Sequence, residues 1–338
     1  MSLFTVGIPV YNGMPFLPEA IESILSQTFD DYELLVINDG STDGSWAYLK
    51  SLRNRHLRLI SQENQGLTAT LNRMLEEARS SWLVRLDADD IACPNRLKVV
   101  AGHVSRYPES GMFYSRAKYH KQTSAVCLTR STEATPSDLR ALVQRGYLLS
   151  ICHSSVVLNV QKTLALGGYR FNLHIEDLDL WWRMALAHDI VFIPEVTVAY
   201  RLNNGGICAT NLSELECHTL FAQYLLLSHL WDMQPFPFVK IQPVLQSLLD
   251  RRRLIYREHM WRAAISMSAR KYGRAACHTV VAACSAPRCF LQRTLYPLHR
   301  PAMTRIGESP EAFRRMRDQI WPTLFFTTIT SPSPYRAI

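Results

Sequence analysis

The sequence lacks an uncharged stretch long enough to form a membrane-spanning helix. Its windows without Asp, Glu, Lys or Arg include 217–231, 275–287 and the proline-broken 319–335. Each is shorter than the roughly 18–20 apolar residues that a spanning helix requires. The N-terminal residues MSLFTVGIPVYN also lack a basic leader and a cleavage site, and they have the pattern of a strand. We therefore expect a cytoplasmic protein, either soluble or held peripherally at the cytoplasmic face of the membrane.

Paired cysteine motifs are also missing. The eight cysteines of this 338-residue chain form no Cys-x-x-Cys pair and no repeated framework. This excludes a small disulfide-stapled module and favours free thiols in a reducing compartment over metal ligation. Apolar residues make up 47% of the chain and charged residues 20%, a balance that is typical of a folded protein.

Charge is distributed unevenly along the chain. Residues 1–209 contain 20 basic and 21 acidic residues, whereas residues 210–338 contain 17 and 8, so the last part carries the whole net charge of +8. Such an asymmetry marks a boundary, here near 205–215. We predict an α/β catalytic domain over 1–209 and a basic, helical C-terminal region over 210–338.

The first part of the chain alternates between strand and helix patterns. Buried strands are predicted at 5–11, 32–41, 57–61 and 81–88, and helices at 18–28, about 43–53 and about 66–79. This alternation predicts a mostly parallel sheet between layers of helices.

Polar clusters follow three of these strands. They are Asn12, the pair Asn38 and Asp39, and the acidic group of Asp87, Asp89 and Asp90. Ligands of open α/β sheets bind at the carboxyl ends of the strands, so the three loops are expected to converge on one pocket. Crowded carboxylates favour a hard cation such as Mg²⁺ or Mn²⁺. For an Asp-x-Asp pair alone, a solvated acidic turn is the simpler interpretation.

Five segments together carry a resemblance to a known family. They are IPVYN (8–12), VINDGSTDGS (36–45), NQGLTATLN (64–72), RLDADDIACPNRL (85–97) and GGYR…HIEDLDLWWRM (167–184). In this order and spacing the chain resembles the family 2 glycosyltransferases over roughly residues 3–205. The resemblance implies the GT-A fold and transfer of a sugar from a nucleotide diphosphate donor to an acceptor.

The resemblance also implies residues that bind the donor. Pro9, Tyr11 and Asp39 would line the nucleobase pocket, where a tyrosine ring can stack on the base and a carboxylate can accept the imide proton of uracil. Asp87 would reach the ribose, and Asp89 would bind the donor through the metal, Mg²⁺ or Mn²⁺.

The sequence departs from the family pattern at two positions. Asn38 replaces an aspartate, and Leu71 replaces an arginine that follows the N-x-G segment in many relatives. We interpret Leu71 as core and Asn72 as polar support. Asp90 is expected to cap the following turn. Arg85 either supplies positive charge to the donor or forms a structural ion pair with an acid of the cluster.

The segment HIEDLDLWW supplies the candidate for a catalytic base, although its three acids could also only cap the helix that follows. A sugar hydroxyl is a poor nucleophile, so a carboxylate must accept its proton. By resemblance that residue is Asp177, with Glu176 beside it, at the start of a helix over 176–187, where Asp179 points about 200° away from Asp177. One of the two neighbouring tryptophans must be core, and Trp182 is either core or a wall of the sugar pocket.

Two further expectations follow from the resemblance. A single base implies direct displacement and inversion, because double displacement needs a second, nucleophilic carboxylate. The glycine- and asparagine-rich segment 198–210 is expected to be a flap, whose residues Tyr200 and Arg201 either touch the diphosphate or hold the flap in place.

The C-terminal region contains long helical patterns and lacks the family motifs. It packs on the catalytic domain, pairs subunits, or docks on an anionic membrane. The docking alternative rests on Arg251, Arg252, Arg253, Arg257, Arg262, Arg270, Lys271 and Arg274, which alternate with Tyr256, Trp261 and Ile265. Nucleic acid is not an expected partner, because no binding motif accompanies the basic residues.

Together these features predict an inverting hexosyltransferase for surface polysaccharide or glycoconjugate synthesis. It would take the sugar from a nucleotide-diphosphate donor, for which UDP is the expected nucleotide, to a hydroxyl of a glycan or lipid-linked acceptor. The alternative is a module that binds the nucleotide-sugar without turnover. A dinucleotide oxidoreductase is disfavoured, because no G-x-G-x-x-G follows the first strand.

Overall fold

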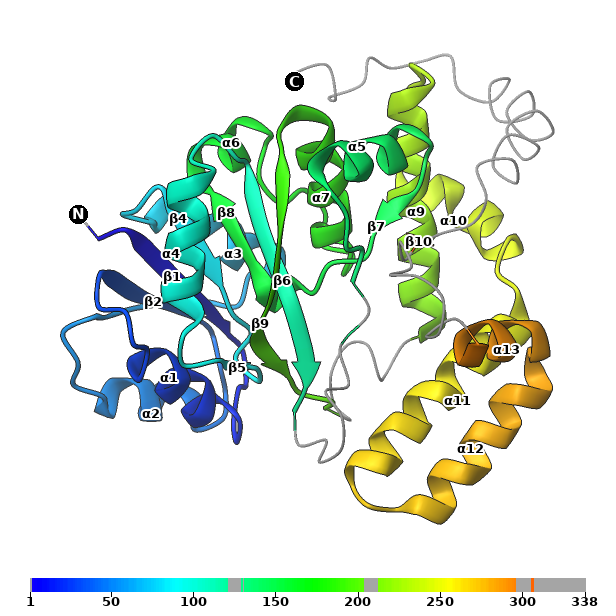
Figure 1. Cartoon of the computed structure of the whole chain (residues 1–338), viewed down its shortest axis with the longest axis horizontal. Coiled ribbons are helices and arrows are strands. Elements are labelled where there is room, and N and C mark those ends of the chain that lie inside the picture. Colours follow the sequence, from blue (N-terminus) through cyan, green and yellow to red (C-terminus); the bar gives the residue numbers. More distant parts are fainter. Residues whose placement is uncertain (1, 121–128, 130, 204–211, 296–304, 307–338) are drawn as a thin grey trace.

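The computed structural model describes residues 2–120, 129, 131–203, 212–295 and 305–306 (Figure 1). Its centre is an eight-stranded sheet with the order β3-β2-β1-β4-β8-β6-β9-β5. The strands are β1 (Phe4–Val10), β2 (Tyr32–Asp39), β3 (Leu57–Gln62), β4 (Trp82–Arg85), β5 (Ile91–Ala92), β6 (Met112–Tyr119), β8 (Val156–Asn159) and β9 (Ile190–Tyr200). A second, antiparallel pair joins β7 (Leu148–Leu149) to β10 (Arg305–Ile306).

Most strands of the large sheet run in one direction. Strand β1 is parallel to β2 and β4, β2 is parallel to β3, and β6 is parallel to β9. Strand β8 is antiparallel to both β4 and β6, and β5 is antiparallel to β9. The carboxyl ends of the six co-directional strands therefore share one edge, toward the bottom of Figure 1. The predicted mostly parallel sheet is confirmed.

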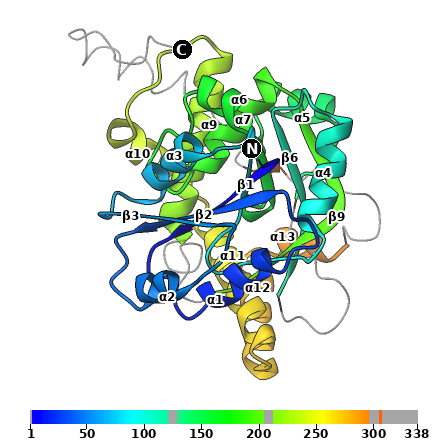
Figure 2. The ribbon, with the colours of Figure 1, turned by 90° about the vertical axis from the view of Figure 1, so that its left-hand side faces the viewer.

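Helices cover both faces of this sheet. Those of the first part are α1 (Leu17–Leu25), α2 (Ser45–Ser51), α3 (Leu67–Glu77), α4 (Arg96–Arg106), α5 (Pro136–Gln144), α6 (Val160–Ala165) and α7 (Glu176–Ala187). In Figure 2, α3 lies above strands β2 and β3, and α1 and α2 lie below them.

The alternation of side chains along β2 explains the two layers. Leu34 and Val36 join one buried cluster with residues of α1 and α4, and Leu35 and Ile37 join the other with residues of α3 and α7. Successive side chains of a strand point to opposite faces, so a continuous apolar run fills a core on each side.

Five helices follow the sheet within the described residues. They are α9 (Leu212–Leu230), α10 (Phe238–Ser247), α11 (Arg251–Ser268), α12 (Tyr272–Ser285) and α13 (Pro287–Leu295). Cys217, Leu220 and Phe221 of α9 share the buried cluster of α3 and α7. The packing alternative is therefore confirmed for α9. The boundary predicted near 205–215 overlaps residues 204–211, which lie outside the described residues. Within the described part, no helix is both long and apolar enough to cross a bilayer.

Candidate active site

The acidic loop, residues 87–90, follows β4 at the shared edge of the sheet. One carboxylate oxygen from each of Asp87, Asp89 and Asp90 lies within 4.8 Å of the others. Burial and the neighbouring carboxylates raise the pKa of Asp89, and raise that of Asp90 to about 8. The Oδ2 atom of Asp90 is buried and has no hydrogen-bond partner. A buried, unpartnered oxygen beside two further carboxylates fits a divalent cation.

Arg85 forms a structural ion pair with Asp87. Its buried guanidinium donates to both carboxylate oxygens of Asp87, and Arg96 Nη2 donates to the Arg85 carbonyl at 2.7 Å. Of the two roles predicted for Arg85, the structure supports the ion pair. Asp87 is thereby neutralised within the chain. Within the described residues, no Lys, Arg or His side chain forms an ion pair with Asp89 or Asp90.

The prediction that Asp90 caps the next turn is wrong. Its Oδ1 instead accepts the backbone N–H of Arg201 over 2.8 Å, because β5 places the acidic loop beside the end of β9. The guanidinium of Arg201 donates to the Asp89 carbonyl at 2.8 Å, pairs with Glu19 at 2.5 Å and stacks on Phe16. These contacts hold the Arg201 side chain between the acidic loop and α1.

The remaining flap residues are only partly described. Tyr200 at the end of β9 packs edge to face against Tyr119, with 6.1 Å between ring centroids. Residues 204–210 of the expected flap lie outside the described residues.

The three polar loops converge as predicted. Asn12 Oδ1 accepts the backbone N–H of Thr42 over 2.8 Å, and the Met14 N–H donates to Asp43 Oδ2 over 3.1 Å. A Cβ built on Gly13 would lie 3.5 Å from Cβ of Ala88, so the loop after β1 lies directly against the acidic loop. One edge of the sheet therefore carries all three clusters.

The residues expected around the nucleobase differ in accessibility. Tyr11 is 54% exposed at the end of β1, available for stacking, whereas Pro9 is buried within the strand. Asp39 is buried and accepts three hydrogen bonds, from Gln62 Nε2 at 2.7 Å and from the N–H groups of Gln65 at 2.9 Å and Gly66 at 3.0 Å. Asp39 therefore fixes the loop between β3 and α3.

That loop and α3 hold the segment that leads into α7. Asn72 exchanges two hydrogen bonds with the backbone of Tyr169, at 2.8 and 2.9 Å, and Thr68 Oγ1 donates to the Phe171 carbonyl at 2.9 Å. Gly168 has a φ of +60°, and a Cβ there would lie 2.5 Å from Asn72 Oδ1. Leu71 is fully buried. The prediction of Leu71 as core and Asn72 as polar support is confirmed.

Helix α7 begins at Glu176, as predicted, and separates three acids by their surroundings. Asp179 is fully buried and pairs with Arg170 at 2.6 Å and Arg183 at 2.7 Å. Glu176 is also buried, and Asp177 is half-buried. The first turn therefore presents Asp177 to solvent, while Asp179 faces the opposite way and stabilises the segment before the helix.

Burial shifts the pKa values of the two acids of the first turn. Burial and the charge of Asp177 raise the pKa of Glu176 to about 8, and burial raises that of Asp177 to about 6. Arg85 and Asp87 act on both groups through their charges. The start of α7 is therefore close enough to the acidic loop for the two sets of carboxylates to interact.

Residues 153 and 154 connect these two sets of acids. Ser154 Oγ donates to Asp87 Oδ2 at 2.8 Å, and His153 Nδ1 lies 4.0 Å from Glu176 Oε1. His153 Nε2 and the Tyr169 hydroxyl are 3.0 Å apart. Burial and the charge of Arg85 lower the pKa of His153 well below its usual value, so the ring is neutral.

Sequence reasoning missed these two residues. The available signal was the polar triplet His-Ser-Ser inside the apolar run ICHSSVVL, where polar residues of a buried segment need partners.

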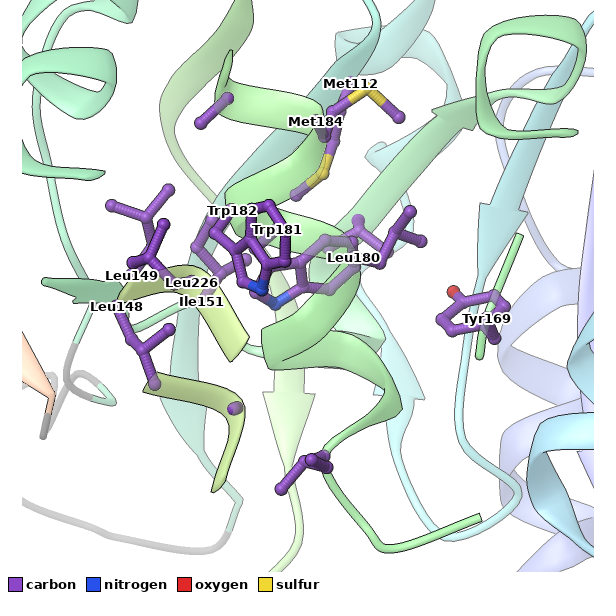
Figure 3. Packing of buried hydrophobic residues seen from close by; sticks show 14 of the residues in the cluster. Met112, Leu148, Leu149, Ile151, Tyr169, Leu180, Trp181, Trp182, Met184 and Leu226 are labelled. Carbon is purple, nitrogen blue, oxygen red and sulfur yellow. The ribbon is translucent and has the colours of Figure 1, made fainter. Parts of the chain in front are cut away.

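Both tryptophans of α7 are core residues. Trp181 and Trp182 lie side by side among Leu149, Ile151 and Leu226 (Figure 3). The ring of Trp182 also packs against His229 of α9, with 5.4 Å between centroids. Of the two roles predicted for Trp182, the structure supports the core residue rather than a wall of the sugar pocket.

Comparisons with known proteins agree with this arrangement. Residues 5–159 match the model of glycosyl transferase family 2. The putative glycosyltransferase EpsE of Bacillus subtilis is 28% identical over 187 residues, which cover 53% of this chain and 65% of EpsE. The amylovoran biosynthesis glycosyltransferase AmsE of Erwinia amylovora is 28% identical over 211 residues, covering 59% of this chain and 76% of AmsE.

A solved structure shares the fold. Residues 1–349 of S. aureus TarS, in complex with UDP-GlcNAc, superimpose with a TM-score of 0.56 at 16% identity, covering 84% of this chain and 91% of that one. The matched domain, the sheet and the acidic loop at its edge lead to one assignment. Residues 5–159 therefore form a family 2 glycosyltransferase domain, and the chain has the GT-A fold.

Proposed function

We propose that the enzyme transfers a sugar from a nucleotide-diphosphate donor to an acceptor hydroxyl with inversion, and that Asp177 is the base. One observation carries this proposal: Ser154 Oγ donates to Asp87 of the acidic loop at 2.8 Å while the adjacent His153 lies 4.0 Å from Glu176, so the start of α7 lies near the acidic loop. An anionic donor and its metal would thus bind beside a carboxylate able to accept a proton.

The environments of the two acids of α7 assign their roles. At neutral pH, a pKa of about 6 leaves Asp177 ionised, and a pKa of about 8 keeps Glu176 protonated. A base must be ionised and must reach the acceptor, and Asp177 is the more exposed of the two. Asp177 is therefore the proton acceptor, while Glu176 packs against His153.

The partners of the other acids support inversion. Double displacement requires a free nucleophilic carboxylate near the anomeric carbon. Arg85 neutralises Asp87, and Arg170 and Arg183 bind Asp179, so neither acid is available as a nucleophile. These pairings favour direct displacement assisted by Asp177.

The donor set of the acidic loop fits Mg²⁺ or Mn²⁺. Asp89 would hold the ion, with the unpartnered oxygen of Asp90 beside it. When bound, the ion neutralises the charge of the leaving diphosphate. Arg201 and Asp90 would maintain the shape of the loop around it, through the hydrogen bonds described above.

We further propose a UDP-sugar as donor and a glycan or lipid-linked sugar of surface polysaccharide synthesis as acceptor. The exposed ring of Tyr11 at the end of β1 supports stacking on a base. The similarity to TarS in complex with UDP-GlcNAc supports a UDP-sugar as donor. The similarity to the amylovoran biosynthesis glycosyltransferase AmsE supports a role in polysaccharide synthesis.

Replacement of the base tests the proposal. Asp177→Asn should lower turnover about 10²–10⁴-fold, because asparagine cannot accept the proton, and should leave donor affinity nearly unchanged. In the parent, turnover should fall as pH decreases below about 6, where Asp177 becomes protonated. The measurements are transfer from UDP-sugars with Mn²⁺ and calorimetric binding of UDP.

The control variant is Glu176→Gln, which removes an ionisable group from the same turn. If it lost as much turnover as expected for Asp177→Asn, while the latter kept parental turnover, the base would be Glu176. A parent that bound UDP-sugars but released no UDP with any acceptor would be a binding module, which is the alternative function.

A further inference from the structure

Helices α11 and α12 form an antiparallel hairpin that projects from the body. In Figure 1 it extends past the edge of the sheet at which the strands end, with α11 nearer the body and α12 outside. Arg257 of α11 pairs with Glu216 of α9. The hairpin interior is made mainly of small residues, including Ala263, Ala275 and Ala282.

The structure revises the face that the sequence suggested for membrane contact. Tyr256 is buried, and the indole Nε1 of Trp261 is buried as well. These aromatic side chains of α11 therefore contribute to packing. Exposed apolar side chains of the hairpin lie mainly on α12, together with Met267 near the end of α11.

One side of α12 is exposed and uncharged. We call this side the hairpin surface; it consists of Tyr272, Cys277, Val280, Val281 and Cys284. At 100° per residue Cys277, Val280, Val281 and Cys284 lie on the side away from Ala275 and Ala282, whereas Tyr272 in the first turn lies about 60° from Ala275. Val280 is 61% exposed and Tyr272 equally so. Helix α12 therefore has two apolar sides. Small residues on one side face α11, and no described element covers the other side.

The tip of the hairpin carries unbalanced positive charge. Arg270, Lys271 and Arg274 are exposed around the first turn of α12, where the helix dipole already favours anions rather than cations. No acidic residue occurs between Glu258 and Glu308. The tip thus combines three cations with a helix N-terminus, and it has no acid nearby in the sequence to compensate them.

We propose that the hairpin surface docks on an anionic lipid bilayer. The apolar side of α12 would enter the interface between headgroups and acyl chains, and the cations of the tip would contact lipid phosphates. A second copy of the chain is a less suitable occupant, because pairing two such surfaces would bring their cations together. A free phosphate would use the tip but not the apolar side.

The hairpin extends in the direction in which the co-directional strands of the sheet end (Figure 1). The inference itself does not depend on the proposed function, because binding is measured without turnover.

Flotation of the full chain with vesicles tests the inference. Binding is compared between phosphatidylcholine alone and equal amounts of phosphatidylcholine and phosphatidylglycerol. We expect binding to the anionic vesicles only, weakened by salt. Arg270→Gln/Arg274→Gln should lower partitioning roughly 10- to 30-fold, at about fivefold per cation. Val280→Asp should also lower it about tenfold or more, because it places a charge on the apolar side.

Matched controls separate docking from general effects. Val239→Asp changes an apolar side chain that is 81% exposed on α10, and Lys98→Gln/Arg106→Gln removes two exposed cations from α4. Both controls should bind as the parent does. Circular dichroism should show the same unfolding temperature for all variants.

Four results would overturn the inference. They are equal binding to neutral vesicles or none to either kind, hairpin variants that bind like the parent, loss of binding on adding inorganic phosphate at constant ionic strength, and a dimer that Val280→Asp dissociates. The third would indicate a small-anion site, and the fourth a subunit interface.

Discussion

Ser154 and Asp87 exchange hydrogen bonds in both directions: Ser154 Oγ donates to Asp87 Oδ2 at 2.8 Å and accepts the Asp87 backbone N–H at 3.1 Å. Arg85 binds the same carboxylate. A single rotamer of Asp87 satisfies all these contacts, so the start of the acidic loop is fixed before any donor binds. The geometry of a metal and diphosphate site depends on such prior positioning.

Ser154→Ala should therefore weaken donor binding several-fold and destabilise the fold by about 1–2 kcal/mol, because a buried hydrogen bond to a charged group is lost. Ser155→Ala is the matched control: Ser155 is equally buried and donates to the Cys152 carbonyl at 2.8 Å, away from the acids. It should lose similar stability and keep donor affinity. Equal donor affinity in both variants would contradict a positioning role for Ser154.

Asp89→Asn should lower the affinity for UDP in the presence of Mn²⁺ about tenfold or more, because the ion loses a charged ligand. The fold should not be destabilised, since burial and Asp87 already disfavour the charged form of Asp89 and raise its pKa. The measurements are calorimetry with and without Mn²⁺ and denaturant unfolding. Asp31→Asn, an exposed acid before β2, serves as the control. Unchanged metal-dependent affinity would remove Asp89 from the metal site.

Glu176→Gln should stabilise the protein in a pH-dependent way. The pKa of Glu176 is raised to about 8 in the fold, so the folded state retains a proton that the unfolded chain releases above its usual value near 4.5. The stability of the parent should therefore fall, relative to the variant, as pH rises from about 5 to about 8, by at least about 1 kcal/mol. Denaturant unfolding at both pH values measures this. A constant difference would show that Glu176 ionises normally.

Asp179→Asn should destabilise the fold by about 3–5 kcal/mol, because it removes the carboxylate that pairs with Arg170 and Arg183 in a fully buried position. The Asp179 carboxylate faces away from the base two residues earlier. Any loss of activity in the Asp179→Asn variant would therefore follow from loss of folded protein. Asp189→Asn breaks an exposed pair with Arg140 and should change stability by less than about 1 kcal/mol. Chemical denaturation compares the two. Similar small effects would contradict a structural role for Asp179.

Local patterns predicted most of the catalytic fold. Strand and helix periodicity gave the order of elements from β1 to β4, and the start of α7 at Glu176 was located correctly. These features depend on neighbours along the chain. The acidic loop was predictable for the same reason, since three carboxylates after a buried strand require a cation or a counter-charge.

Contacts between distant segments were not predictable in this way. Asp90 bonds to the Arg201 backbone only because β5 pairs with β9, and Trp182 is core only because α9 covers it. In α11, apolar residues occur around the whole helix, so the sequence did not indicate that Tyr256 faces inward. Whether Tyr256 faces inward depends on how α11 packs in the folded chain.

The sequence by itself thus determined the α/β architecture and the acidic loop, because periodicity and local charge are encoded over short stretches, and its resemblance to a known family indicated Asp177 as the candidate base. Only the tertiary structure decided which acids are neutralised, that His153 and Ser154 join the two sets of carboxylates, and which side of α12 is exposed. Burial and long-range partners set these properties, and they exist only once the chain has folded.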